Sequence, residues 1–241
     1  MISYHPLHSK KAGELNWDES IEENYSLCRH QTTFWLIVDN AKGKILDAGC
    51  GLGRWVAFLH QRGCDISGID ASPATVARVS TLPITVGDVR HIEGRYDTII
   101  SLGVVEHFRE GPMEALEEMW WSLRPNGKLL ISIPTNNILR MLLTNHLKRL
   151  YWIGKLMKFE EHRYTRKEFK ALLKKAKFKV LIEAPDDFIP PLNIGLWVDF
   201  PFLRAGYWRL NKVGMLLRNI LWAISPWICP CGAFYVCEKE N

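Results

Sequence analysis

The 241-residue sequence predicts an α/β fold, in which a mostly parallel sheet of seven strands carries helices on both faces. From Lys44 onward, short apolar runs alternate with helical patterns, and this alternation is typical of such a sheet. Apolar residues make up 47% of the chain, which is enough for a core of that size. We therefore expect one sheet domain over 44–241, preceded by a segment over 1–43.

The first four strands are predicted by apolar runs at 44–49, 64–70, 84–88 and 96–103. An amphipathic pattern after the first run ends at Gly63, a suitable helix C-cap, and Pro73 suits the first turn of the next helix. After the fourth run, apolar residues at helical spacing predict a helix, with Met113, Leu116, Trp120 and Leu123 on one face. Residues 125–127 end this helix.

The last three strands are expected at 128–134, 178–184 and 232–238. Thr165 and Glu168 form a capping-box pattern ahead of a helix that carries Phe169, Leu172 and Leu173. Two segments are longer than the alternation requires, 136–163 and 185–231, and both are rich in large apolar and aromatic residues. Long insertions in a compact domain usually have a function, so we place recognition of the substrate, called the acceptor below, in these two segments. Residues 1–43 are expected to form a helical cover over the ligand edge of the sheet.

Several classes of protein are disfavoured by the sequence. The polar amino-terminal residues lack the apolar core of a secretory signal, so a cytoplasmic location is expected. The uncharged stretch 219–237 reaches the minimum length of a membrane span, but Pro226, Pro230 and Gly232 interrupt it. The six cysteines show no metal-site or disulfide spacing, so we expect reduced thiols and no metal.

A glycine-rich turn follows the first predicted strand. After Asp47 come Gly49, Gly51 and Gly53, which allow a sharp turn and close approach of a ligand to the backbone. A dinucleotide fingerprint would need a further glycine where this chain has Arg54. The turn therefore favours a smaller nucleoside ligand without a pyrophosphate, and it disfavours a nicotinamide-dependent oxidoreductase.

Acidic residues end the next two predicted strands. Asp70 ends the second strand, where a carboxylate can accept hydrogen bonds from ribose hydroxyls, and Asp88 ends the third, where it can accept from the exocyclic amine of adenine. Either residue alone could be a solvated turn residue. Ligands of open parallel sheets bind at the carboxyl ends of strands, so the three neighbouring strand ends together indicate a nucleoside site.

The successive motifs ILDAGCGLG, SGIDAS, VGDV, YDTIISLGVVEHF and LRPNGKLLISIP resemble those of class I S-adenosylmethionine-dependent methyltransferases, which have a Rossmann-like fold. The segment EEHRYTRKEFKALLKKAKFKV is similar to the small-molecule methyltransferases of the ubiquinone and menaquinone type (type 11), except that Lys177 stands where they often have glycine. The resemblance implies S-adenosyl-L-methionine as cofactor. It also implies the cofactor-binding residues, which are Asp47, Gly49, Gly51, Gly53, Asp70, Ala71, Asp88, Val89, Ser101 and Leu102.

Methyl transfer from a sulfonium requires mainly alignment of the acceptor, and a general base if the acceptor must lose a proton. His107 follows the fourth strand on the side where the methyl group should project, and it is our candidate base. It could equally hydrogen-bond the loop or cap the next helix. Glu106 is expected to hold backbone or the cofactor amine, and 162–164 could face the acceptor or form an ordinary polar turn.

The charge pattern bears on the acceptor. Residues 136–175 hold eleven Lys or Arg against three Glu, among many apolar side chains, in a chain whose net charge is only +5. A basic, aromatic-rich surface suits a small apolar or aromatic acceptor, lipid- or quinone-like, and peripheral membrane contact. The aromatic residues could instead roof a small-molecule pocket. The alternatives are an RNA methyltransferase, which the lack of an RNA-binding module disfavours, and a cofactor-binding adaptor without turnover.

Overall fold

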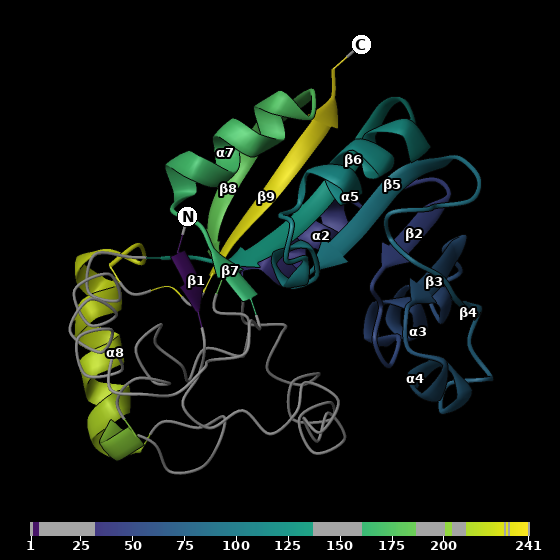
Figure 1. Cartoon of the computed structure of the whole chain (residues 1–241). Helices are drawn as coiled ribbons and strands as arrows, with labels where there is room; N and C mark the ends of the chain where they lie inside the picture. Colours follow the sequence, from purple (N-terminus) through teal and green to yellow (C-terminus); the bar gives the residue numbers. More distant parts are fainter. Residues whose placement is uncertain are drawn as a thin grey trace, which may run out of the picture.

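The computed structural model describes residues 2–4, 32–136, 161–186, 201–203, 211–228, 230 and 232–240. A seven-stranded sheet in the order β4-β3-β2-β5-β6-β9-β8 forms its centre (Figure 1). The strands are β2 (Ile45–Ala48), β3 (Ile66–Asp70), β4 (Ile84–Val86), β5 (Tyr96–Leu102), β6 (Leu123–Pro134), β8 (Phe178–Asp186) and β9 (Gly232–Lys239). All seven predicted strands are present, so the predicted α/β fold is confirmed.

The first five strands of the sheet are parallel. After each of them, a helix or a loop carries the chain back to the edge from which the strands start. β9 differs, since it lies between β6 and β8 and is antiparallel to both. The pairing of Asp186 with Gly232 explains this direction. The chain leaves β8 at the carboxyl edge of the sheet and re-enters β9 at the same edge, so β9 must run the opposite way.

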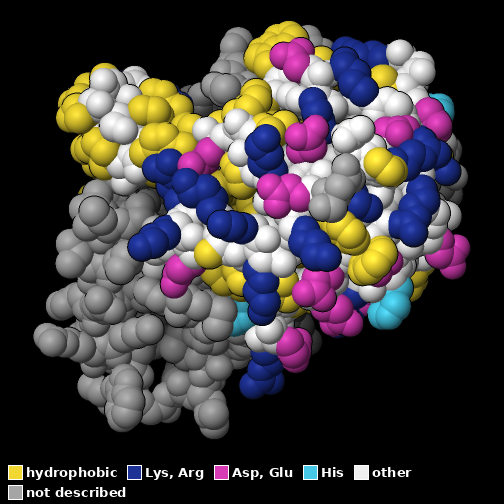
Figure 2. Space-filling model, turned by 90° about the horizontal axis from the view of Figure 1, so that it is seen from above, with side chains coloured by type: hydrophobic (Ala, Val, Ile, Leu, Met, Phe, Trp, Pro, Cys, Tyr) yellow, Lys and Arg dark blue, Asp and Glu magenta, His cyan; other side chains and the backbone are white. Residues whose placement is uncertain are grey.

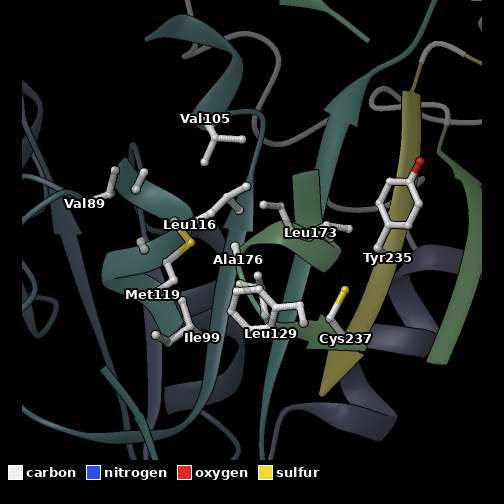
Figure 3. Close-up of a cluster of buried hydrophobic side chains, with 14 of the residues drawn as sticks. Val89, Ile99, Val105, Leu116, Met119, Leu129, Leu173, Ala176, Tyr235 and Cys237 are labelled. Carbon is white, nitrogen blue, oxygen red and sulfur yellow. The ribbon is translucent and has the colours of Figure 1, made fainter. Parts of the chain in front are cut away.

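Helices cover both faces of the sheet, as predicted. α2 (Thr32–Asn40) and α3 (Arg54–His60) pack on one face, and α5 (Met113–Ser122) and α7 (Arg166–Lys175) pack on the other. Each face of the sheet thus has a hydrophobic core. Figure 3 shows the core on the second face, in which Leu116 and Met119 of α5 meet Leu129 of β6. The alternation along β6 is regular: Leu129 points to this core and its neighbour Leu130 to the other.

Local signals explain where the helices begin and end. The capping box predicted for α7 is present, with the Thr165 hydroxyl accepting from the Glu168 N–H and the Glu168 carboxylate accepting from the Thr165 N–H. Lys177, at the position where the family often has glycine, takes a left-handed φ of 61° just after this helix. The turn therefore forms with lysine, at the cost of a conformation that glycine adopts more easily.

The stretch 219–237 is divided between a helix and a strand. α8 (Lys212–Ile224) ends before Pro226, and β9 begins at Gly232. Among the described residues, no helix has both the length and the apolar character needed to cross a bilayer. The predicted interruption of this stretch is thus confirmed.

Both predicted insertions leave and rejoin the described chain at the carboxyl edge of the sheet. The first follows β6, and Thr135 forms a bridge with Tyr164 where the chain returns. There β1 (Ile2–Tyr4) and β7 (Glu161–Arg163) form a small antiparallel sheet. In the predicted amino-terminal cover, residues 5–31 lie outside the described residues, and α2 packs on a sheet face.

Candidate functional site

The glycine turn lies at the carboxyl end of β2, between β3 and β5, where the strand order reverses. This position is the usual ligand site of an open α/β sheet. Gly49, Gly51 and Gly53 all have left-handed backbone conformations, with φ of 80°, 54° and 68°. The N–H groups of Gly49 and Cys50 both donate to the Ile69 carbonyl, at 2.8 and 2.9 Å, so β3 holds the turn in place. The turn is therefore part of the sheet edge itself.

The three glycines differ in what surrounds them. A Cβ at Gly49 would collide with Val104, and one at Gly53 would collide with Ile84, so both are required for packing as well as for φ. Among the described residues, no atom lies within 4 Å of a Cβ built at Gly51. The open space at Gly51 is where a ligand can approach the backbone closely.

Asp70 connects the end of β3 to this turn. Its Oδ2 accepts from the Gly51 N–H at 2.9 Å, and its Oδ1 accepts from the Ser72 N–H, also at 2.9 Å. Each carboxylate oxygen has two lone pairs, so each retains one acceptor position. Asp70 is thus oriented beside the open space at Gly51, as a ribose-binding carboxylate would need to be. Ala71, the next residue, is exposed at the same strand end.

Asp47 is a buried carboxyl group, 4% exposed, near the end of β2. Burial and, to a smaller extent, the charge of Asp70 raise its pKa to about 7, and Arg54 acts in the opposite direction. A positively charged ligand group would stabilise the ionised form of such a carboxyl. Asp47 therefore suits the predicted role beside the cofactor amine.

Asp88 follows β4 and is strongly paired with Arg90. Its Oδ2 lies 2.6 Å from the Arg90 guanidinium, and its Oδ1 accepts from both the Arg90 N–H and Nε, at 2.9 and 3.0 Å. These bonds lower the pKa of Asp88, so it is ionised at neutral pH. Arg90 in turn lies over the Phe108 ring, 4.9 Å from its centroid. An adenine amine would share the Asp88 carboxylate with Arg90.

The remaining predicted cofactor residues lie at the same edge. Ser101 and Leu102 end β5, and Val89 follows Asp88 with its side chain in the core shown in Figure 3. Ser101 is fully buried, and its hydroxyl has no hydrogen-bond partner among the described residues. Val104, two residues after β5, contacts the glycine turn at Gly49. The structure thus places all the predicted strand ends at one edge of the sheet.

His107 and Glu106 lie on a short 3₁₀ turn, η1 (Val105–His107), just beyond β5. The Glu106 side chain is only 2% exposed, whereas that of His107 is 53% exposed. The His107 Nε2 lies 4.0 Å from the Glu106 Oε1. A half-exposed imidazole beside a buried carboxylate can accept a proton and be stabilised as the cation.

A second group of buried polar side chains lies beside η1, where β7 packs against it. His162 Nε2 is 3.0 Å from the Arg109 carbonyl, and the His162 and Tyr164 rings are 5.9 Å apart. Burial, together with the charges of Glu106 and Glu168, raises the pKa of Tyr164 to about 12, so its phenol is neutral. This group borders the point where the first insertion rejoins the sheet.

Sequence reasoning missed two features of this edge. The pairing of Arg90 with Asp88 could have been suspected from their spacing, because a residue two positions after an acidic turn residue often folds back on it. The contact between Val104 and Gly49 joins residues far apart in the sequence, and no local pattern signals it. The sequence also offers Tyr25 and Arg29, on a helix expected before the sheet, as residues that could close over the cofactor carboxylate or simply lie on the helix surface. Both lie outside the described residues. The expectation of no metal stays a prediction.

Comparison with known proteins connects this geometry to a family. A family profile described as a methyltransferase domain matches residues 21–183. The chain is 29% identical over 128 residues to a mitochondrial ubiquinone biosynthesis O-methyltransferase of Schizosaccharomyces pombe, a match that covers 46% of each chain. It is 35% identical over 102 residues to a tRNA U34 carboxymethyltransferase of Saccharophagus degradans, covering 36% of this chain and 31% of that one.

The fold is shared with solved methyltransferases. The magnesium protoporphyrin IX methyltransferase of Synechocystis, solved with bound SAH, superposes with a TM-score of 0.57 at 15% identity. The match covers 92% of this chain and 86% of that one. The resemblance to class I S-adenosylmethionine-dependent methyltransferases is confirmed, and so is the expected cofactor, S-adenosyl-L-methionine. The matches span less than half the length of the two curated relatives.

Proposed function

Because this chain belongs to the methyltransferase domain family, we propose that it transfers a methyl group from S-adenosylmethionine to a small apolar or aromatic acceptor of the lipid- or quinone-like kind. One observation carries the proposal. At the switch point of the sheet, the Gly51 backbone faces open space and donates its N–H to Asp70, whose carboxylate retains acceptor positions. This arrangement fits a nucleoside that lies close to the Gly51 backbone and whose ribose binds the Asp70 carboxylate.

The residues present fit the cofactor in two places. Asp70 would accept from the ribose hydroxyls, and the buried Asp47 would face the positively charged methionine part. The Asp88 oxygens already accept four hydrogen bonds from Arg90, so an adenine amine would have to replace one of them. When bound, the cofactor supplies an electrophilic methyl group on a sulfonium, so that the protein has mainly to orient the acceptor and exclude water.

We assign His107 the role of general base. The backbone of η1 places it just beyond β5, at the edge where the glycine turn lies. Its imidazole would take the proton from an acceptor hydroxyl, and the Glu106 carboxylate, 4.0 Å away, would stabilise the resulting cation. For an acceptor that carries no acidic proton, His107 would only line the site.

The acceptor class is supported by topology and by one relative. Both insertions begin and end at the carboxyl edge, which is the side on which the acceptor must enter. The ubiquinone biosynthesis relative supports a quinone-like acceptor. The tRNA relative and the basic α7 support RNA as a second candidate. RNA binding would weaken steeply with added salt, whereas binding of an apolar acceptor would not.

Calorimetric titration with S-adenosylmethionine, S-adenosylhomocysteine and NAD tests the cofactor site. We expect the first two to bind and NAD not to bind, and Asp70→Ala to weaken binding by roughly tenfold or more through lost hydrogen bonds to a charged group. Asp65→Ala is the matched control, because Asp65 is exposed just before the same strand, at the opposite edge. A folded chain that binds neither adenosyl ligand would contradict the proposal.

Transfer of a labelled methyl group tests turnover separately. Phenolic quinone precursors and lipid extracts are expected to become labelled, and unmodified tRNA is not. Labelling of tRNA alone would favour the RNA alternative. Cofactor binding without transfer to either acceptor would favour an adaptor without turnover.

A further inference from the structure

We propose that α8 is a docking helix for an anionic lipid surface. Five large apolar side chains at this helix face solvent and form what we call the apolar stripe; they are Phe202, Val213, Leu216, Ile220 and Ile224. Their exposed fractions lie between 50% and 71%, far above those of the core residues. Exposed apolar surface of this extent usually marks an interaction site.

The stripe follows from the geometry of the helix. Val213, Leu216, Ile220 and Ile224 are spaced by three or four residues, so they lie on one face of α8, and the buried Gly214 lies on another. The amino-terminal end is fixed by Asn211, whose side chain donates to the Phe202 carbonyl at 2.6 Å and accepts from the Gly214 N–H at 2.9 Å. These bonds place η2 (Pro201–Leu203), with the exposed Phe202, next to the stripe.

The charge around the stripe points to an anionic partner. Residues 200–237 contain four basic residues and no Asp or Glu. Two of the basic residues, Lys212 and Arg218, lie on α8 itself. An apolar stripe on a helix whose charged residues are both basic is the pattern of a helix that lies in an interface with anionic lipid.

The neighbouring helix adds to the positive potential. The Arg166 guanidinium at the start of α7 lies 3.6 Å from the centroid of the Trp227 ring, so the start of α7 contacts the segment that follows α8. α7 carries five basic residues and one Glu, and two of the five, Arg166 and Lys170, are paired with Glu183 of β8. Figure 2 shows Lys and Arg side chains beside the apolar side chains over α8, on the left of the molecule. Basic and apolar groups are therefore available to the same surface.

The location of α8 relates it to the site. The segment between β8 and β9 that contains α8 starts and ends at the carboxyl edge of the sheet, the same edge as the glycine turn. A membrane bound at α8 would lie on the side of the molecule where an acceptor enters. Docking does not depend on the proposed methyl transfer, however, because it needs neither cofactor nor acceptor.

Co-sedimentation with lipid vesicles tests the proposal. We expect the full chain to bind vesicles of phosphatidylglycerol and phosphatidylcholine in about equal parts, and to bind pure phosphatidylcholine at least about tenfold more weakly. Added salt should weaken the binding to anionic vesicles without abolishing it, because screening reduces the charge contribution and leaves apolar insertion intact.

The double variant Leu216→Gln, Ile220→Gln removes the centre of the stripe. We expect binding to fall at least about tenfold for each side chain withdrawn from the lipid. Trp121→Gln is the matched control, because Trp121 is 59% exposed on α5, away from α8, and its loss should leave vesicle binding unchanged. Thermal unfolding of each variant checks that the fold is retained.

Three results would overturn the proposal: no binding to anionic vesicles by folded protein, equal binding to neutral vesicles, or wild-type binding by the double variant. A fourth concerns a second copy of the chain. Light scattering that shows a dimer without lipid, converted to a monomer by the double variant, would assign the stripe to self-association instead.

Discussion

Asp47 is the site residue through which stability depends most directly on pH. Its folded pKa of about 7 lies well above the ordinary value of 3.8, because the carboxyl is buried and faces Asp70. A raised pKa means that the folded chain binds a proton more tightly than the unfolded chain does. The contribution of this proton to stability is therefore complete below about pH 4 and is lost as pH rises towards and through 7.

Asp47→Asn is the corresponding test. The amide resembles the protonated carboxyl, so the variant should match the wild type near pH 4 and be more stable above pH 7, by roughly 4 kcal/mol. Urea unfolding at pH 5, 6, 7 and 8 measures this difference. Cofactor affinity should rise with pH in the wild type, where the ionised carboxyl faces a cation, and not in the variant. A stability difference that did not change with pH would contradict the assignment.

His107 is the second residue whose role can be separated from packing. If it is the base, His107→Gln should lower kcat by about 10²-fold to 10⁴-fold with little change in cofactor affinity, and should remove the dependence of kcat on ionisation of the imidazole. His91→Gln, an exposed histidine beyond β4, is the control and should keep full activity. An unchanged kcat in His107→Gln would assign His107 to the loop alone.

The glycine turn is an element in which neighbouring positions predict opposite results. Gly53→Ala forces a side chain against Ile84 at a left-handed φ of 68°, so it should destabilise the fold by about 2 kcal/mol or more. Gly51→Ala meets no atom of the described chain within 4 Å, so it should cost only about 1 kcal/mol from the left-handed φ. Its methyl group would instead occupy the open space.

Paired measurements of unfolding free energy and cofactor affinity distinguish the two glycines. Gly51→Ala should lose cofactor binding by about tenfold or more while remaining folded, because the methyl group competes with the ligand for the same space. Gly53→Ala should show the larger loss of stability. If Gly51→Ala bound the cofactor like the wild type, the open space would have no part in binding.

The elements show what the sequence could predict. Strands such as β2 and β5 were predictable because a short buried run allows few other structures, and the capping box of α7 is a local hydrogen-bond pattern. The antiparallel direction of β9 was not predicted, because it depends on where a long segment re-enters the sheet. β6 also begins earlier than expected, at Leu123, with Asn126 at a φ of 61° inside it.

The site shows the same division. Spacing along the chain placed Gly51, Asp70 and Asp88 at strand ends, and the parallel topology brings those ends together. The bidentate pairing of Asp88 with Arg90 depends on side-chain rotamers, and the pKa of Asp47 depends on burial by several elements. Such features arise only after the chain is packed.

At the scale of the whole molecule, the two edges of the sheet have different tasks. The carboxyl edge holds the glycine turn, Asp70 and His107, and both insertions join it. The amino edge holds structural pairs: Asp97 Oδ2 accepts from the Lys44 N–H at 2.8 Å and from the Arg124 guanidinium at 2.7 Å. These bonds lower the pKa of Asp97, so it remains ionised and paired well below neutral pH.

This division predicts a clean separation of effects. Asp97→Asn should lower the free energy of unfolding by about 1 kcal/mol, because it weakens two hydrogen bonds to a charged group, and it should leave cofactor affinity unchanged. Asp70→Ala, at the carboxyl edge, should instead affect cofactor affinity more than the free energy of unfolding. The pKa of Asp97 is lowered on folding, so its contribution to stability is present at neutral pH and is lost as pH falls below the ordinary carboxyl value and through the lowered one. The difference between the two proteins in urea unfolding should therefore shrink as pH falls through the acid range. A change in cofactor affinity in Asp97→Asn would mean that the two edges are coupled through the strands that join them.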